Sequence, residues 1–258
     1  MAEIHPTAVV DPGAELASDV RVEAFAVVGA GVELGQGVVV GPHAVLSGRT
    51  RVGSGTRISS HACLGCAPQH REHVGETTRL EIGCENEIRE HVTISLGTVG
   101  GGGCTFIGDR NLFMNASHVG HDCRIGSNCE IASFSGLAGH VVVEDFAVLG
   151  AYTGIHQHCR VGENVMAASG AKLSLDAPPF TLVAGDRARL VGLNDIGLRR
   201  RGVSGDRQLA LKRAFRTIFR SGLRLEEATR QLTPDCAAHP EIEHLLGFLQ
   251  KSERGFCR

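Results

Sequence analysis

One feature restricts the fold of this chain more than any other: an aliphatic residue recurs at every sixth position. In the middle of the chain the series reads Val119, Ile125, Ile131, Leu137, Val143, Leu149, Ile155 and Val161. A period of six matches neither the helical period of 3.6 residues nor the two-residue alternation of a strand with one buried face. It is typical of a parallel β-helix, in which three short strands make one triangular coil of roughly eighteen residues and each aliphatic side chain points inward.

The same period begins almost at the N-terminus and continues without a gap through Ile4, Val10, Leu16, Val22, Val28, Leu34, Val40, Leu46, Val52, Ile58 and Leu64. Small or β-branched residues stand two positions before these aliphatics, as at Ala8, Ala14 and Val20. The absence of Trp, an aromatic content of 4% and 34 glycines suit thin stacked coils better than a core of large side chains. We therefore predict a mainly β fold, with a parallel β-helix over residues 1–190.

Two segments interrupt the period, and we predict that both form external loops, near residues 66–81 and 97–106. The first has no six-residue pattern until the phase resumes at Ile82. The second contains four consecutive glycines at 100–103, but without a following Lys-Ser/Thr they do not match a phosphate-binding P-loop. Loops that leave a rigid scaffold often carry ligand contacts.

The period fades after Leu173, and a new pattern predicts a small α-helical domain over residues 191–258. The pair Pro178-Pro179 breaks the repeat, and apolar stripes with helical spacing follow around Leu211 and Ile242. The first of these helices and its approach are basic, with Arg199, Arg200, Arg201, Lys212, Arg213, Arg216, Arg220 and Arg224. Such a face is either only solvated or a docking surface for an acidic partner.

Because one coil holds about eighteen residues, side chains eighteen positions apart form columns with a spacing of about 4.8 Å. One column contains His121, Gly139 and Gln157, and the adjacent one contains Asp122, His140 and His158, with His118 and His156 nearby. A scaffold needs none of these polar residues. An imidazole beside a carboxylate suits removal of a proton from a hydroxyl or an amine, so we expect His121 to be a general base and Asp122 its partner. No Ser lies in a nucleophile-elbow context, which favours direct group transfer over an acyl-enzyme.

Charge and cysteine content exclude several classes of protein. The net charge of -2 indicates no general affinity for nucleic acid, and no segment resembles a signal peptide or an integral membrane span. We expect a cytoplasmic protein whose nine cysteines are free thiols. Cys63 and Cys66 form a single CxxC without a second ligand pair, which argues against a zinc or redox site there.

A set of motifs resembles one known family. The motifs are His5-Pro-Thr-Ala8, Gly75 to Gly83 (GETTRLEIG), Ser117 to Cys123 (SHVGHDC), Leu137-Ala-Gly-His140, Ile155-His-Gln157, Asp176-Ala-Pro-Pro179, Gly192-Leu-Asn194 and Leu198 to Gly202 (LRRRG). Together and in this order they are similar to UDP-N-acetylglucosamine O-acyltransferases, which begin lipid A biosynthesis. The likeness covers essentially the whole chain, whereas other hexapeptide acyltransferases share only the repeat.

This resemblance implies a left-handed coil, a homotrimer with sites between subunits, and a role for individual residues. His121 is implied to deprotonate the sugar 3-hydroxyl with Asp122 as its partner, while the N–H of Gly139 stabilises the oxyanion. The residues implied to bind substrate are Gln69, His118, His140, His156, Gln157, Asn194 and Arg200, and those implied to limit the acyl length are Ser169 and Arg187. The implied donor is a 3-hydroxyacyl group on the phosphopantetheine arm of acyl carrier protein, with no metal and no other cofactor.

Some positions depart from the family pattern. His70 and Glu72 stand where the family typically has Asp and Lys, and Ile196 replaces an acidic residue. Ser95-Leu96-Gly97-Thr98 replaces His-Arg-Gly-Thr. These departures leave open an altered UDP-sugar, such as a 3-amino analogue that would take an amide-linked chain.

The sequence leaves three further alternatives open. A metal-dependent hydratase with the same fold would use interfacial histidines such as His118, His121 and His140 as ligands. A related N-acyltransferase or acetyl-CoA-dependent enzyme would share the repeat. A non-catalytic homologue would bind carrier protein without transferring its acyl chain.

Overall fold

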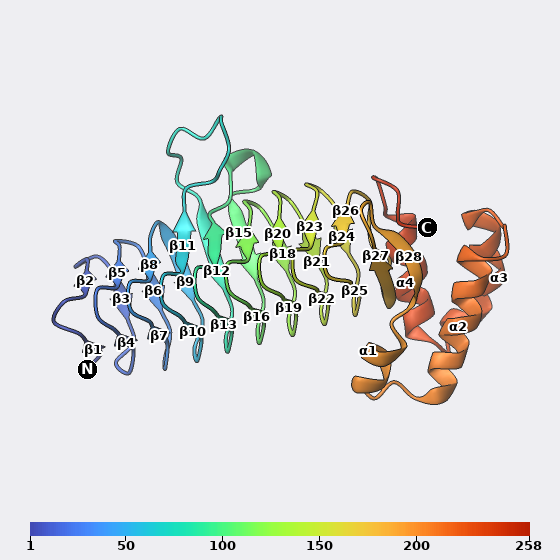
Figure 1. The fold of residues 1–258 in the computed structure, drawn as a ribbon, viewed down its shortest axis with the longest axis horizontal. Coiled ribbons are helices and arrows are strands. Elements are labelled where there is room, and N and C mark those ends of the chain that lie inside the picture. The colour runs from blue at the N-terminus through green and yellow to red at the C-terminus, as the bar shows by residue number, and fades with distance from the viewer.

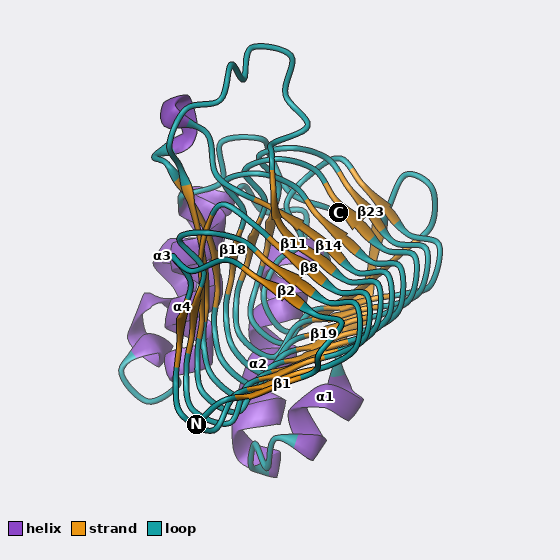
Figure 2. Cartoon of the chain, turned by 90° about the vertical axis from the view of Figure 1, so that its left-hand side faces the viewer, coloured by secondary structure: helices purple, strands orange, loops and turns teal.

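The computed structural model describes residues 1–258 and confirms the predicted fold class, a left-handed parallel β-helix followed by helices (Figure 1). Three sheets form the sides of a triangular prism. In Figure 2 the N-terminal end faces the viewer, and the chain turns anticlockwise as it recedes. This is the left-handed sense, opposite to the usual crossover preference.

Most strands are two residues long, and each pairs in parallel with the strands of the neighbouring coils. Sheet A contains β1 (Glu3–Ile4), β4 (Arg21–Val22), β7 (Val39–Val40), β10 (Arg57–Ile58), β13 (Glu87–Ile88), β16 (Leu112–Phe113), β19 (Glu130–Ile131), β22 (Val148–Leu149), β25 (Met166–Ala167), β27 (Thr181–Ala184) and β28 (Arg189–Leu193). Sheet B contains β2 (Val9–Val10), β5 (Val27–Val28), β8 (Val45–Leu46), β11 (Cys63–Cys66), β14 (Thr93–Ser95), β17 (His118–Val119), β20 (Gly136–Leu137), β23 (Gly154–Ile155) and β26 (Lys172–Leu173). Sheet C contains β3 (Glu15–Leu16), β6 (Glu33–Leu34), β9 (Arg49–Val52), β12 (Arg79–Ile82), β15 (Cys104–Ile107), β18 (Arg124–Ile125), β21 (Val142–Val143) and β24 (Arg160–Val161).

The hexad aliphatics fill the interior of the prism. In sheet B, for example, Val119, Leu137 and Ile155 pair in register on successive coils, and all three are buried. Each added coil therefore extends one continuous apolar core, whose burial is the main stabilising contribution. The outward residues of the same strands are free to carry other chemistry.

At each edge of the prism one residue adopts the left-handed backbone conformation, with a positive φ angle. Asp122, His140 and His158 have φ angles of 59°, 62° and 62° at the edge between sheets B and C. Asp, Asn and His adopt this conformation more readily than most other side-chain-bearing residues. The turns of the coil thus favour the residue types that the site uses.

Two loops leave the prism at the edge between sheets B and C (Figure 1). Residues 67–78 join β11 to β12, and residues 96–103 join β14 to β15 and include the short helix η1 (Val99–Gly101). Figure 2 shows both loops projecting from the same edge. They are the only large excursions from the coil before the C-terminal cap.

The C-terminal part caps the prism and adds helices α1 (Asp195–Arg200), α2 (Gly205–Phe219), α3 (Leu225–Cys236) and α4 (Pro240–Gln250). Sheet A ends in an antiparallel β27–β28 pair that continues to Leu193, so the helices begin beyond the boundary at residue 190 that composition suggested. Ser204 caps α2 and Pro240 opens α4, in line with ordinary start signals. None of the four helices combines the length and apolarity that a membrane crossing requires.

Candidate active site

The stacked polar columns lie at the edge between sheets B and C, where the two loops emerge. Residues 120–123 join β17 to β18, and residues 138–141 join β20 to β21 one coil further on. The N–H of His140 donates to the carbonyl of His121 at 2.9 Å, and the N–H of His158 donates to that of Gly139 at 3.2 Å. The eighteen-residue period therefore places these residues together, although they are far apart in sequence.

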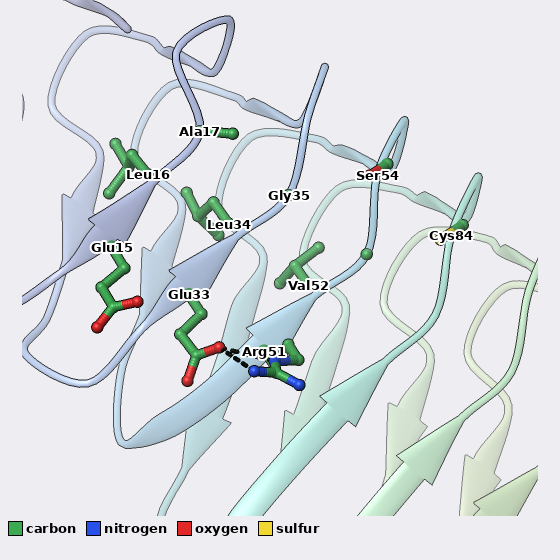
Figure 3. A pocket seen from close by; sticks show the side chains of 11 residues that line it. Glu15, Leu16, Ala17, Glu33, Leu34, Gly35, Arg51, Val52, Ser54 and Cys84 are labelled. Carbon is green, nitrogen blue, oxygen red and sulfur yellow. Dashed lines mark hydrogen bonds and ion pairs between the residues drawn. The ribbon is translucent and has the colours of Figure 1, made fainter.

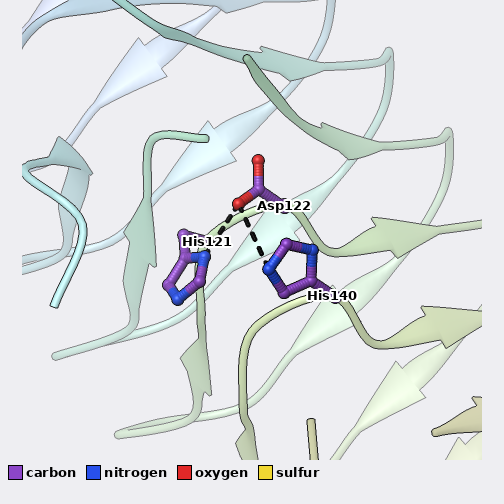
Figure 4. A group of neighbouring side chains, drawn as sticks. All are labelled: His121, Asp122 and His140. Carbon is purple, nitrogen blue, oxygen red and sulfur yellow. Dashed lines mark hydrogen bonds and ion pairs between the residues drawn. The ribbon is translucent and has the colours of Figure 1, made fainter. Parts of the chain in front are cut away.

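His121 and Asp122 form a hydrogen-bonded pair (Figure 4). The distance from His121 Nδ1 to Asp122 Oδ2 is 2.8 Å, and the carboxylate is fully buried. Burial by itself would raise the pKa of Asp122, but hydrogen bonds from Thr98 and His121 outweigh burial and hold that pKa below its usual value. An ionised Asp122 fixes the His121 tautomer, with the proton on Nδ1 and the lone pair on Nε2.

The second loop supplies the support for Asp122. The backbone N–H and the hydroxyl of Thr98 donate to the two carboxylate oxygens at 2.8 and 2.6 Å. Gly101 packs so closely that a Cβ there would lie 2.0 Å from the Asp122 carboxyl carbon. The Asp122 N–H donates to the Thr105 hydroxyl at 2.8 Å. The sequence drew attention to this loop, but only the structure assigns Thr98, Gly101 and Thr105 to the carboxylate.

Gly139 lies directly beneath the His121 ring. A Cβ at position 139 would lie 2.5 Å from His121 Cε1, so no larger residue fits without displacing the imidazole. The N–H of Gly139 donates no hydrogen bond within the chain. A free backbone donor beside a general base is the arrangement that stabilises an oxyanion.

Other imidazoles surround the His121–Asp122 pair. His70 meets the His121 ring edge-on at a centroid distance of 5.3 Å, and His140 meets it at 5.1 Å and lies 3.8 Å from Asp122. His158 stacks on His140 at 4.4 Å. Burial lowers the pKa of His140, which keeps this ring neutral at neutral pH.

His118 lies on the same coil as His121 and is one of the residues that line a groove on sheet B. Its Nδ1 is 2.7 Å from the hydroxyl of Thr93, and burial lowers the pKa of its imidazole. The groove has a volume of about 780 Å³ and is lined by His118, Gly136, Leu137, Ala138, Gly154, Ile155, His156, Lys172, Leu173, Ser174, Leu175, Asp186, Arg187 and Arg254. Of the two residues implied to limit acyl length, Arg187 lines this groove, whereas Ser169 lies after β25 at a different edge and does not.

The remaining implied substrate residues are separated within one chain. Gln69 is exposed in the first loop next to His70, and Gln157 is exposed in the column of His121. Asn194 caps α1 by accepting from the Gly197 N–H at 3.0 Å. Because α1 follows sheet A, which is opposite the edge between sheets B and C, Asn194 and Arg200 do not reach the His121 of their own chain (Figure 2).

His121, Asp122 and His140 also form the one cluster whose ligand atoms are close enough, within 4.8 Å of one another, to hold a metal ion. However, Asp122 already accepts three hydrogen bonds, from Thr98 twice and from His121. These three hydrogen bonds already hold the carboxylate and orient the imidazole, so the pair needs no metal ion to fix its geometry. The geometry favours an acid–base pair over a metal-ligand set.

A separate hollow lies near the N-terminal end of sheet C. Its volume is about 420 Å³, and an exposed ion pair between Glu33 and Arg51 crosses it at 2.6 Å (Figure 3). The residues that line it include no histidine, and therefore no histidine–carboxylate pair that could remove a proton from a hydroxyl. It adds no candidate chemistry.

Comparison with known proteins decides between the families that share this fold. Residues 176–257 match the model of domain 2 of UDP-N-acetylglucosamine O-acyltransferase, and residues 104–139 match that of the bacterial transferase hexapeptide repeat. Over its full length the chain is 46% identical to the acyl-[acyl-carrier-protein]--UDP-N-acetylglucosamine O-acyltransferase of Thiobacillus denitrificans, with 258 residues aligned and 100% of both chains covered. The chain belongs to the UDP-N-acetylglucosamine O-acyltransferase family.

Two further comparisons describe the extent of the likeness. The enzyme of the same name from Anaeromyxobacter dehalogenans is 44% identical over 166 residues, an alignment that spans 64% of this chain and 65% of that protein. The crystal structure of UDP-N-acetylglucosamine O-acyltransferase from Moraxella catarrhalis superposes with a TM-score of 0.96 at 36% identity, covering 99% of each chain. The family likeness therefore includes both the β-helix and the C-terminal helices.

Proposed function

We propose that this family member transfers a 3-hydroxyacyl chain from acyl carrier protein to the 3-hydroxyl of UDP-N-acetylglucosamine, the first step of lipid A biosynthesis. The observation that carries the proposal is the His121–Asp122 pair at 2.8 Å above the free N–H of Gly139. The full-length likeness to an enzyme named for this reaction supports it.

In this mechanism His121 Nε2 takes the proton of the sugar hydroxyl as the oxygen attacks the thioester carbonyl. The negative charge then develops on the carbonyl oxygen, where the N–H of Gly139 can donate to it. Collapse of the intermediate breaks the carbon–sulfur bond, and the thiolate of the phosphopantetheine arm receives the proton from His121. The ionised Asp122 stabilises the imidazolium between these two steps.

We further propose a homotrimer in which a neighbouring subunit completes the site. Within one chain the basic end of α1 is remote from His121, yet Arg200 is suited to the diphosphate of a nucleotide sugar. A neighbouring copy can bring its own Asn194 and Arg200 to this edge. The basic surface of α2 would then receive the acidic carrier protein. We also propose that the reaction takes place in the cytoplasm.

One observation favours a second acceptor. His70 contacts the His121 ring edge-on where the family typically has an Asp, so a second imidazole lies beside the proposed general base. A neutral imidazole can accept a hydrogen bond from an amine as well as from a hydroxyl. The 3-amino analogue of UDP-N-acetylglucosamine is therefore the alternative acceptor, and it would give an amide.

The test is a mass-spectrometric assay of the purified protein with 3-hydroxyacyl carrier proteins of graded length and with both sugars. We expect a mono-acylated product from the wild type and almost none from His121→Ala, with His43→Ala as the matched control. An ester or amide product decides between the two acceptors. No product with any donor and either sugar would contradict the proposed activity, and stoichiometric zinc in an inactive protein would favour the hydratase alternative.

A further inference from the structure

Three consecutive arginines at the end of α1 have different surroundings. Arg199 Nε donates to the carbonyl of Asp195 in the same helix at 3.3 Å. Arg201 forms an ion pair with Glu163 of the prism. Arg200, between them, is exposed, and its side chain makes no ion pair or hydrogen bond within the chain. Of the three guanidinium groups, that of Arg200 is therefore the one free to meet a ligand.

Arg201 ties the C-terminal end of α1 to the edge between sheets C and A. Its guanidinium pairs with Glu163 and also lies over the ring of Phe146, 3.8 Å from the centroid. Phe146 lies between β21 and β22, and Glu163 lies one coil further on, between β24 and β25. Only 27% of the Arg201 side chain and 26% of the Glu163 side chain are exposed. A guanidinium that is both paired and stacked is held more firmly than one in an ordinary surface ion pair.

The N-terminal end of α1 is held by separate contacts. Asn194 Nδ2 donates to the carbonyl of Asn164 at 3.0 Å, and Leu198 is fully buried. A Cβ at Gly197 would lie 2.3 Å from Asn194 Nδ2, so the helix approaches this side chain closely. A helix of six residues is not stable by itself, and its position depends on such contacts. The contacts of Arg201 act at the other end, next to Arg200.

We propose that Arg201 is a positioning residue, which holds the end of α1 on the prism and so places Arg200 for the diphosphate of the sugar nucleotide. This inference rests on the proposed function, from which it takes the diphosphate contact of Arg200. Arg201 acts through its neighbour, because Glu163 and Phe146 already occupy its own guanidinium. A guanidinium placed before the ligand arrives binds more tightly, since less side-chain and helix motion is lost on binding.

The experiment measures the Kd of UDP-N-acetylglucosamine by calorimetry without donor, and KM and kcat with saturating 3-hydroxyacyl carrier protein. Arg200→Ala should weaken binding about tenfold or more, because it removes a charge-assisted hydrogen bond. Arg201→Met and Glu163→Gln should each weaken it about fivefold, with kcat within about twofold of the wild type. Arg201→Lys keeps a cation for Glu163 but loses the planar stack, so it should restore part of the affinity.

A double-mutant cycle separates positioning from a general loss of structure. In the Arg200→Ala background, Arg201→Met should cause no further loss of affinity, because the group that it positions is absent. Arg207→Met is the matched control, since its ion pair with Glu241 joins α2 to α4 and leaves α1 untouched. This control should keep the Kd and kcat of the wild type. Size-exclusion chromatography checks that every variant keeps the oligomeric state, and Glu163→Gln carries the test if Arg201→Met folds poorly.

The outcomes distinguish this inference from the proposed function. An unchanged Kd in both Arg201→Met and Glu163→Gln, or in Arg200→Ala, overturns the positioning role and leaves the proposed reaction intact. An equal loss of affinity from Arg201→Met with and without Arg200 also overturns it. A wild type that binds the sugar nucleotide but forms no product with any donor overturns the proposed transfer, while the Kd values still decide the role of Arg201. A wild type that does not bind the nucleotide overturns both.

Discussion

Two edges of the same prism carry histidines on left-handed turns, yet only one of them pairs a histidine with a fully buried carboxylate. At the edge between sheets A and B, His43, His61 and His91 stack face to face with centroid distances of 4.9 and 5.0 Å, and Phe25 extends the stack. At the edge between sheets B and C, the ring of His121 is hydrogen-bonded to Asp122.

The difference lies in what surrounds the rings. None of the three stacked histidines has a carboxylate partner, and all are exposed. By contrast, loop 96–103 covers Asp122, and Gly139 leaves room for the His121 ring. The corners of the coil thus accommodate histidine at both edges. A histidine that acts as a general base also needs a buried carboxylate and a loop that holds this carboxylate in place.

Breaking the proposed catalytic pair, His121 and Asp122, should have the largest effect. We expect His121→Ala to lower kcat by about a thousandfold, because general-base catalysis contributes a factor of this order. His61→Ala, which removes a histidine from the other edge, should leave kcat unchanged. Both variants should keep the oligomeric state and Tm of the wild type, since neither side chain belongs to the aliphatic core. Equal losses of activity in the two variants would mean that the edges do not differ in function.

Moving the His121 imidazole out of position should reduce activity less than removing it. Gly139→Ala places a Cβ against the His121 ring, and we expect kcat to fall about a hundredfold because the base is misplaced. Gly192→Ala is the matched control, as a Cβ there meets nothing within 4 Å. Steady-state kinetics of both variants with saturating donor give the comparison. An unimpaired Gly139→Ala would show that His121 does not act from the position seen here.

Removing the loop's support for the carboxylate should have a smaller effect. Thr98→Val deletes the 2.6 Å hydrogen bond to Asp122, and we expect kcat to fall about tenfold. The hydrogen bonds hold the pKa of Asp122 low, so the variant should protonate this carboxylate at higher pH and shift the acid limb of the pH–rate profile upward. Thr98→Ser should restore both properties. A profile unchanged in Thr98→Val would remove Thr98 from this role.

The smallest effect concerns an imidazole–carboxylate pair outside the candidate site, which joins α4 to the prism. His244 Nε2 is 2.7 Å from Glu144 and 3.9 Å from Glu163, with Arg160 also facing it. The hydrogen bond to Glu144 raises the pKa of His244. This stabilisation is therefore complete below the unfolded pKa of about 6.5 and is lost as pH rises through the higher folded pKa.

The comparison of wild type with His244→Gln by thermal unfolding measures this pair. We expect the wild type to be more stable by no more than about 1 kcal/mol near pH 6, because the pair is partly exposed. The difference should shrink toward pH 9. A difference that grows with pH would contradict the assigned direction, and activity should be unaffected throughout.

The sequence predicted those parts of the molecule that obey the repeat. Val119, Leu137 and Ile155 could be placed in one buried column because each coil has the same length, and His121 and Gly139 could be placed on adjacent coils by the same rule. The resemblance to the family then gave these residues their expected roles. The prediction was possible because the coils repeat regularly, so that separation in sequence fixes position in space.

The sequence by itself thus determined the prism, its aliphatic core and the meeting of the polar columns at one edge. The tertiary structure alone decided which groups act on those columns: Thr98 on Asp122 and His70 on His121. It also decided that α1 lies away from the His121 of its own chain. The physical reason is that loops, long side chains and docked helices are not part of the repeating coil. Their positions therefore depend on packing and hydrogen bonding rather than on sequence separation.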